Sequence, residues 1–218
     1  MSQLAGYNAD LFIAGVAGSG SAFTHEATTA VIALTEYQIT STSKRYWDPT
    51  VALVVETSPD GTNWTAVTSG FQVAYAGGVI RFPVAQGAGT QVRVSGAYLT
   101  ASVLGQSKEW DLALSLDTPD TTVFTAGTTL SAWKTCVAAL KDATVTVARY
   151  QLDGYFIPTV ADHGTFYILV LYTDYANGKH IDCLARMTAD AIKNAVAGVI
   201  EESLTFKTTG MINTIQAS

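Results

Sequence analysis

Alternation of apolar and polar side chains is the dominant pattern along this chain of 218 residues. It is clearest over Glu109–Asp117, and the same period of two occurs over Gln91–Tyr98 and Ser203–Lys207. Because successive side chains of a strand point to opposite faces, the pattern predicts half-buried antiparallel strands. One face of each strand belongs to a core, and the other faces solvent or a partner. In the first segment the apolar face consists of Trp110, Leu112, Leu114 and Leu116.

Two shorter runs, Val51–Val55 and Phe166–Tyr172, are apolar on both faces. Strands of this kind are covered on both sides, here by a second layer or by a neighbouring subunit. We therefore expect both runs near the centre of the fold. Turn residues separate many of the expected strands, and hairpins are predicted at Ser58–Gly61, Gly77–Gly78, Asp153–Gly154 and Asn177–Gly178.

Helical spacing of apolar residues is rare. It predicts one short helix over Leu130–Leu140 and a second around Ile192–Ile200, after the capping candidates Thr188 and Asp190. The fold class expected is therefore mainly β: an antiparallel sandwich or barrel subunit with one or two short helices over a sheet.

The turn-rich stretch Gly105–Lys108 divides the chain into an N-terminal β-rich half, residues 1–106, and a C-terminal half, residues 107–218. No proline-rich or charged linker separates them, so the two halves should pack tightly.

Composition restricts the function. The chain has 12 Lys and Arg against 18 Asp and Glu, a formal charge of −6, so no nucleic acid should bind specifically. Charged residues make up only 14%, which is low for a monomer that must cover its surface with charge. Part of the surface is therefore expected to be covered by a partner.

No residues in the chain suggest catalysis or metal binding. His25, His163 and His180 are scattered, and Cys136 and Cys183 lack metal-ligand spacing and are expected to be small buried hydrophobes. Alternation would place His180 and Asp182 on one face of a strand and Cys183 on the other. No Ser, His and Asp set has a nucleophile context. We expect neither enzymatic activity, nor a cofactor, nor a metal.

No sequence feature predicts export or a membrane span. Residues Met1–Asp10 lack a secretory pattern, and the longest apolar run, Phe166–Tyr172, is far shorter than the ~20 residues of a spanning helix. The chain is expected to be made in the cytosol and to stay soluble there.

The C-terminal half resembles the tail tube proteins of long-tailed bacteriophages. The resemblance depends on the order of EWDLALSLDTPDTTVF, SAWKTCVAALKDATVTVARYQLDG and ESLTFKTTGMI, read as strand, turn-rich loop, Trp segment, polar strand and terminal strand. In the N-terminal half, YQIT and KRYWDP are similar to phage tail segments, whereas VALVVETSPDGTNW is typical of a sandwich hairpin.

The resemblance implies a hexameric ring in which subunit sheets join into one barrel, with rings stacked into a virion tail tube. The implied partners are further copies of the chain, a tape measure protein and a tube terminator. DNA would pass through without specific binding, and assembly would take place in the host cytoplasm.

An acidic lumen wall would let DNA slide, because like charges repel. The candidate lumen charges are Asp111, Asp153, Glu201 and Glu202. The resemblance also implies inter-ring contacts by an N-terminal arm, Met1–Tyr7, and a loop, Thr118–Thr129. The candidate contact residues are Met1, Leu4, Tyr7, Asp120 and Phe124.

Two other classes of function remain open. A monomeric β-sandwich module of a phage head or fibre would present an exposed aromatic platform around Trp47 or Trp64. An enzyme would need a pocket with convergent titratable groups.

Overall fold

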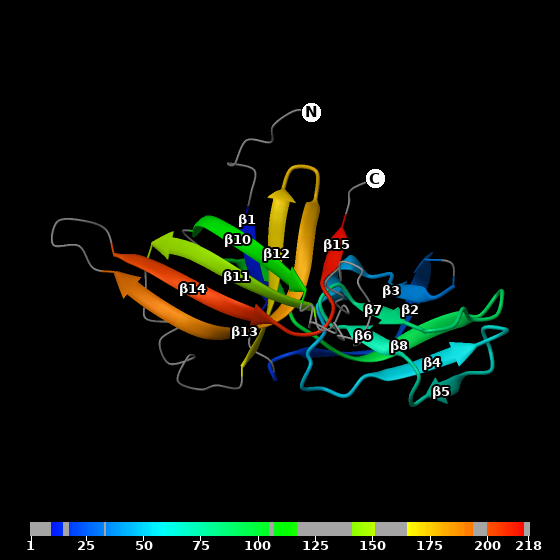
Figure 1. The fold of residues 1–218 in the computed structure, drawn as a ribbon. Helices are drawn as coiled ribbons and strands as arrows, with labels where there is room; N and C mark the ends of the chain where they lie inside the picture. Colours follow the sequence, from blue (N-terminus) through cyan, green and yellow to red (C-terminus); the bar gives the residue numbers. More distant parts are fainter. Residues whose placement is uncertain are drawn as a thin grey trace, which may run out of the picture.

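The fold consists of two antiparallel β-sheets, of eight and seven strands, which lie side by side (Figure 1). The structure is a computed structural model, and it describes residues 10–14, 18–32, 34–104, 107–116, 141–150, 165–193 and 200–215. The expected fold class, mainly β with antiparallel strands, is confirmed.

The eight-stranded sheet has the order β10-β11-β14-β13-β12-β1-β9, and β15 pairs separately with β13. It curls into a half-barrel. Its strands are β1 (Asp10–Ala14), β9 (Ala101–Val103), β10 (Ser107–Leu116), β11 (Lys141–Tyr150), β12 (Phe166–Asp174), β13 (Lys179–Lys193), β14 (Glu201–Thr208) and β15 (Asn213–Ile215).

The seven-stranded sheet has the order β5-β4-β8-β2-β3-β7-β6. A single 3-10 turn, η2 (Thr42–Lys44), follows β3. The strands are β2 (Ser21–Ile32), β3 (Glu36–Ile39), β4 (Val54–Ser58), β5 (Thr65–Val67), β6 (Gln72–Ala74), β7 (Val79–Arg81) and β8 (Gln91–Tyr98).

The curl of the eight-stranded sheet encloses a hydrophobic core. Every second residue of β11 and β14 points into it, including Val145, Val147, Leu204 and Phe206, none of which is exposed. These residues meet Leu169 of β12 from the opposite wall. The alternation predicted over Ser203–Lys207 is therefore confirmed.

The central strand β12 is buried on both faces, as predicted for Phe166–Tyr172. Leu169 and Leu171 point into the curl, whereas Ile168 and Val170 belong to a separate core with Leu99 and Ala76. The second core fills the junction between the two sheets. The second layer is thus the seven-stranded sheet of the same chain.

The prediction for Val51–Val55 is wrong for the single chain. Only Val55 is buried, β4 begins at Val54, and Val51 and Val54 are 37% and 49% exposed. The physical reason is position: β4 has only the short β5 between itself and the end of the sheet, and Val54 stays exposed on its outer face.

The helix expected around Ile192–Ile200 is wrong where the structure describes it. Residues 188–193 are the end of β13, because Asp190 and Ile192 pair with Leu204 and Glu202 of β14. Sheet pairing overrides the local helical spacing. The helix expected over Leu130–Leu140 lies outside the described residues.

The predicted turns at Gly77–Gly78 and Asn177–Gly178 are confirmed as the hairpins β6–β7 and β12–β13. Gly77, Gly78 and Gly178 have φ of 97°, 62° and 67°, a region that favours glycine. Asp153–Gly154 lies outside the described residues.

The N-terminal half contributes strands to both sheets. β1 pairs with β12 and β9, and the Leu104 amide donates to the Leu11 carbonyl at 2.9 Å. The predicted boundary near Gly105 thus falls between β9 and β10, which are both strands of the eight-stranded sheet.

Candidate assembly interface

Four strands, β10, β11, β14 and β13, form one wall of the curl and have two different faces. Their apolar face points into the core. Their polar face carries Asp111, Thr146 and Thr205 in one row across the sheet, and Glu109, Ala148 and Ser203 in the next. We call these the apolar face and the polar face. Apart from charged residues, the polar face consists of Thr, Ser and Ala with Tyr150.

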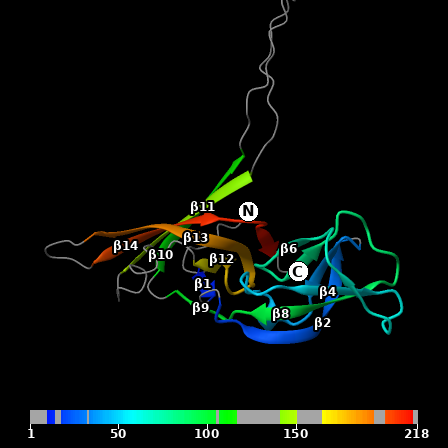
Figure 2. The same ribbon diagram turned by 90° about the horizontal axis from the view of Figure 1, so that it is seen from below.

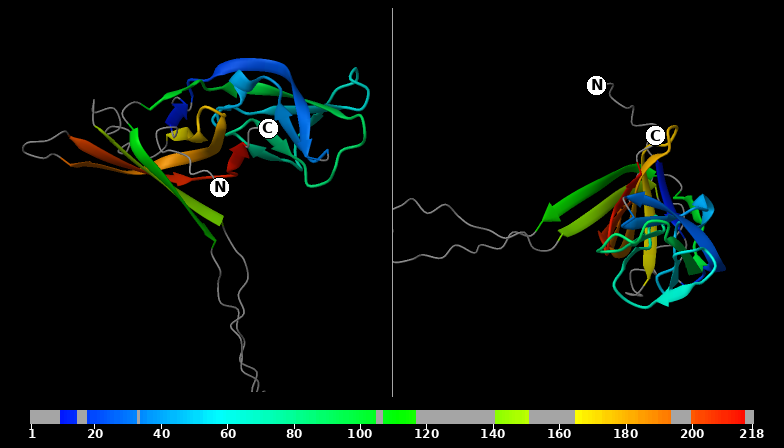
Figure 3. Two further views of the ribbon diagram at one scale, coloured as in Figure 1. Left: turned by 90° about the horizontal axis from the view of Figure 1, so that it is seen from above. Right: turned by 90° about the vertical axis from the view of Figure 1, so that its right-hand side faces the viewer.

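The first open edge of this wall is β10. Among the described residues it pairs only with β11, so one side of its backbone forms no strand pairing there. Figures 2 and 3 show the end of the β10–β11 pair projecting from the rest of the sheet. The register gives the reason, because β14 pairs with β11 only from Thr144 onward.

The second open edge is the distal part of β13. Arg186 pairs with Phe166 of β12 on one side and with Lys207 of β14 on the other. Beyond it β12 has ended, so Met187–Lys193 has no strand on that side in the described part of the chain. An unpaired strand edge is a template for pairing with another chain.

Large apolar side chains are exposed at both edges. Leu114 and Leu116 of β10 are 70% and 47% exposed, and Ile192 of β13 is 42% exposed. All three lie on the apolar face. The predicted apolar face of Glu109–Asp117 thus exists, but only Trp110 and Leu112 of it pack against the core. Leu114 and Leu116 lie opposite Ala143 and Lys141, outside the stretch of β11 that pairs with β14.

A groove of about 500 Å³ continues from these leucines. It lies between the end of the β10–β11 pair and the β14–β15 connection, and Met211 and Ile212 line it. Arg81 of the seven-stranded sheet closes one side and donates from Nη1 to the Met211 sulfur at 3.0 Å.

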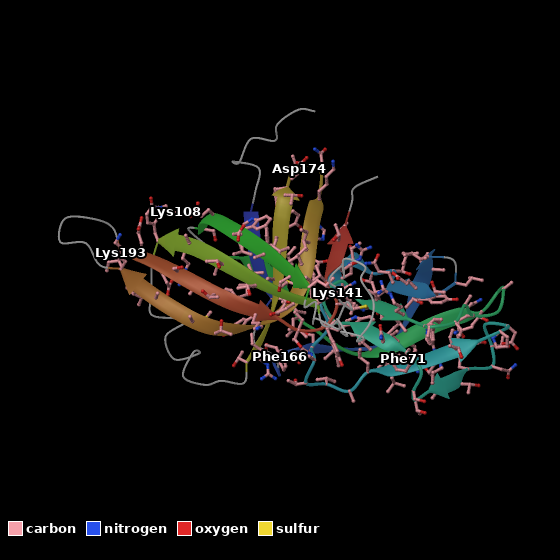
Figure 4. The ribbon with its side chains drawn as sticks, in the orientation of Figure 1. Phe71, Lys108, Lys141, Phe166, Asp174 and Lys193 are labelled. Atoms are coloured by element: carbon pink, nitrogen blue, oxygen red, sulfur yellow. The ribbon has the colours of Figure 1, made fainter. Side chains whose placement is uncertain are left out.

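The predicted lumen charges fall in three different settings. Asp111 is exposed on the polar face. Glu201 is half-exposed on the same face, where Lys108 Nζ donates to its Oε1 at 2.7 Å (Lys108 is labelled in Figure 4). That hydrogen bond lowers the pKa of Glu201 and raises the pKa of Lys108. Asp153 lies outside the described residues.

The prediction for Glu202 is wrong. Its side chain is on the apolar face, fully buried, and forms an ion pair with Arg149 of β11. Adjacent residues of a strand face opposite sides, so Glu201 and Glu202 cannot both line one surface. The five candidates for inter-ring contact, Met1, Leu4, Tyr7, Asp120 and Phe124, lie outside the described residues.

The described part of the polar face is balanced in charge. Two carboxylates have direct partners, Glu201 with Lys108 and Asp142 with Lys207 at 2.9 Å. The remaining carboxylates, Glu109 and Asp111, are both on β10, whereas the remaining cations, Arg186 and Lys193, are both on β13. The acidic wall expected from the overall charge is therefore absent from these residues.

The other chemical groups have structural surroundings. Cys183 is buried and unpaired with another cysteine, and burial, with the Asp182 carboxylate nearby, raises the pKa of its thiol to about 12. His180 and Asp182 share a face as predicted, with Nε2 and Oδ1 3.6 Å apart. In the described part of the chain, no three His, Cys, Asp or Glu residues are grouped as metal ligands.

The prediction of an exposed aromatic platform for a binding module is wrong at Trp47. This side chain is 0% exposed and lies in the core of the seven-stranded sheet. Trp64 is half-buried, and the Arg93 guanidinium lies 4.1 Å from its ring centroid. Arg93 is held in turn by two hydrogen bonds to Glu56.

Sequence reasoning missed Arg149, Asp190 and the edge cations. The signal for Arg149 is its place in the alternation Ala143, Val145, Val147, Arg149, where a charged residue continues an apolar series. Such a residue needs a buried partner, and only the cross-strand register identifies Glu202.

No protein-family model and no curated protein match this chain. Among solved structures, the chain is similar to one from the tail of an empty GTA particle, computed with helical refinement and C6 symmetry. The TM-score is 0.44 at 10% identity, over 54% of this chain and 87% of that chain. No helix in the described residues is long and apolar enough to cross a membrane.

Proposed function

We propose that this chain is a structural subunit that assembles head to tail into rings, and that the rings stack into the tube of a phage-type tail. The observation that carries the proposal is the pair of open edges on opposite sides of the same four strands. A structural rather than enzymatic role is part of the proposal.

The directions of the strands support head-to-tail joining. The order β13, β14, β11, β10 is antiparallel at every step, so β10 of one copy placed beside β13 of the next continues the alternation. A contact between two different surfaces closes into a ring when the rotation allows it. Closure pairs every edge and removes the hazard of exposed strands.

The polar face of the four strands would line the lumen, because their apolar face is occupied by the subunit's own core. Its Thr, Ser and Ala side chains and balanced charges offer DNA phosphates no cluster of cations in the described part. Asp111 and Glu201 remain lumen candidates. The resemblance to tail tube proteins adds four further elements to the proposal: six copies per ring, a tape measure protein, a tube terminator and a location in the virion tail.

The test compares the wild-type chain with edge variants. Sedimentation velocity and negative-stain electron microscopy over a concentration series should show rings of six and stacked tubes for the wild type. Leu114→Lys and Ile192→Lys place a charge on exposed apolar positions at the two edges, so each variant should fold and stay monomeric.

The matched control is Val84→Lys, a 72% exposed valine outside both edges, which should assemble like the wild type. A wild-type chain that stays monomeric at every concentration would overturn the proposal and favour the monomeric binding module. Rings of another number would overturn the hexamer alone.

A further inference from the structure

Trp110 and Asp190 occupy corresponding places at the two open edges. The register joins Trp110 to Val147, Val147 to Leu204, and Leu204 to Asp190. The two residues thus lie in one row, on the apolar face, at opposite ends of the four-stranded wall. In the next row Leu112 stands at the β10 edge and Met187 at the β13 edge.

Each of the two side chains has buried polar atoms without a partner. The Trp110 indole Nε1 donates no hydrogen bond within the described chain, and neither carboxylate oxygen of Asp190 accepts one there. A buried donor or acceptor without a partner costs about 1–3 kcal/mol. One edge therefore offers a donor and the other an acceptor, and both are already out of contact with water.

The groups around Asp190 also affect its ionisation. Burial raises the pKa of Asp190, as do the charge of the Glu202 carboxylate on the neighbouring strand and a hydrogen bond to it, whereas Arg149 acts in the opposite direction. A protonated Asp190 carboxyl donates to Glu202 through one oxygen only, so its other oxygen is left as an acceptor.

The polar face of the same two edges is complementary in charge. Glu109 and Asp111 stand at the β10 edge, where Lys108 is already paired with Glu201, whereas Arg186 and Lys193 stand at the β13 edge with small alanines between them. Figure 4 shows Lys108 and Lys193 at the same end of the four strands. Copies joined in register would bring the acidic edge of one beside the basic edge of the next, which favours a second copy as the occupant.

We propose that β10 of one copy pairs with β13 of the next and that Trp110 donates its indole N–H to the carboxylate of Asp190 across this junction. The inference rests on the proposed self-assembly and names the residues that complete it. Closing a ring requires a stagger between strands. A stagger of two residues makes Trp110 and Asp190 diagonal neighbours, a separation that long side chains span.

The experiment uses Trp110→Phe, which removes the donor, and Asp190→Leu, which removes the acceptor at similar size. Each should raise the concentration needed for assembly by roughly ten- to a hundredfold, since hydrogen bonds to charged groups are among the stronger ones. The double variant should assemble no worse than either single variant, because its junction leaves no polar group unpaired.

Mixing the two single variants distinguishes a contact between copies from one within a copy. An alternating ring of both variants contains intact Trp110–Asp190 junctions at every second position, so the mixture should assemble at lower concentration than either variant alone. Trp64→Phe changes a tryptophan in the connection between β4 and β5, away from both edges; it is the matched control and should behave like the wild type.

The outcomes separate the two proposals. If the wild type assembles while both variants match it, or the mixture gains nothing, the junction is wrong and the assembly function stands. If the wild type never assembles, both are overturned. Far-ultraviolet circular dichroism of the dilute monomers shows whether each variant is folded.

Discussion

Arg149 of β11 lies directly opposite Glu202 of β14, and the two form an ion pair on the apolar face with side chains 5% and 0% exposed. Breaking a buried ion pair by neutralising one partner costs up to about 3–5 kcal/mol. Glu202→Gln should therefore lower the free energy of unfolding by about that amount in urea titrations of the monomer.

Glu201→Gln is the matched control for this prediction. Glu201 pairs with Lys108 on the open polar face, and exposed pairs contribute little. Its stability should stay close to that of the wild type. Equal losses for the two neighbouring glutamates would contradict the assignment of the two faces of β14.

Gly78 and Gly178 allow a second comparison within one chain. Both have positive φ, 62° and 67°, so alanine at either site is strained by about 1–2 kcal/mol. A Cβ on Gly78 would lie 2.8 Å from Ile39 Cγ2 and 3.0 Å from the Arg45 carbonyl oxygen, whereas the space at Gly178 is open. Gly78→Ala should thus destabilise the fold clearly more than Gly178→Ala in thermal unfolding; equal shifts in Tm would argue against the tight β6–β7 turn.

The parts of the fold that follow from local pattern could be predicted from the sequence. Alternation places β8 and β14, and the doubly apolar run at Phe166–Tyr172 places β12 at the centre. The same pattern fails at Val51–Val55, because a run that is apolar on both faces does not show whether a second layer covers it.

The candidate site depends on register, which one sequence does not reveal. Ile192 has helical spacing with later residues and Asp190 is a capping candidate, yet both belong to a strand because Glu202 and Leu204 pair with them. Likewise, within the described residues the edge of β13 beyond Arg186 is unpaired because β12 begins only at Phe166, opposite Arg186. Such facts depend on where distant strands begin and end, so the open edges could only be found in the structure.

Cys183 should be unreactive in the native chain. It is 0% exposed, and burial raises the pKa of its thiol to about 12, so the thiolate that reacts with alkylating reagents is scarce. In a Cys136→Ser background, labelling by iodoacetamide near neutral pH should be slow without denaturant and rapid in urea. Rapid labelling of the folded chain would contradict the burial of β13 in the core.

The junction between the two sheets should respond to pH through His180 and Asp182. Burial lowers the pKa of His180, but the Asp182 carboxylate and the Gly178 carbonyl raise it more, and the result lies above the ordinary value of 6.5. Arg45 and Tyr46 face this pair from the seven-stranded sheet, and Tyr172 faces it from β12. The folded state therefore holds the His180 proton more tightly than the unfolded state does. The resulting stabilisation of the fold is complete below the pKa that His180 has in the unfolded state, and it is lost as the pH rises through the pKa of His180 in the folded state.

The free energy of unfolding should accordingly fall through this site as the pH rises above the ordinary histidine pKa of 6.5. Asp182→Asn removes the carboxylate that favours the imidazolium, so this part of the pH slope should disappear even if the variant is less stable at every pH. A slope that persists in Asp182→Asn would show that another group titrates there and that the His180–Asp182 contact does not couple the sheets to pH.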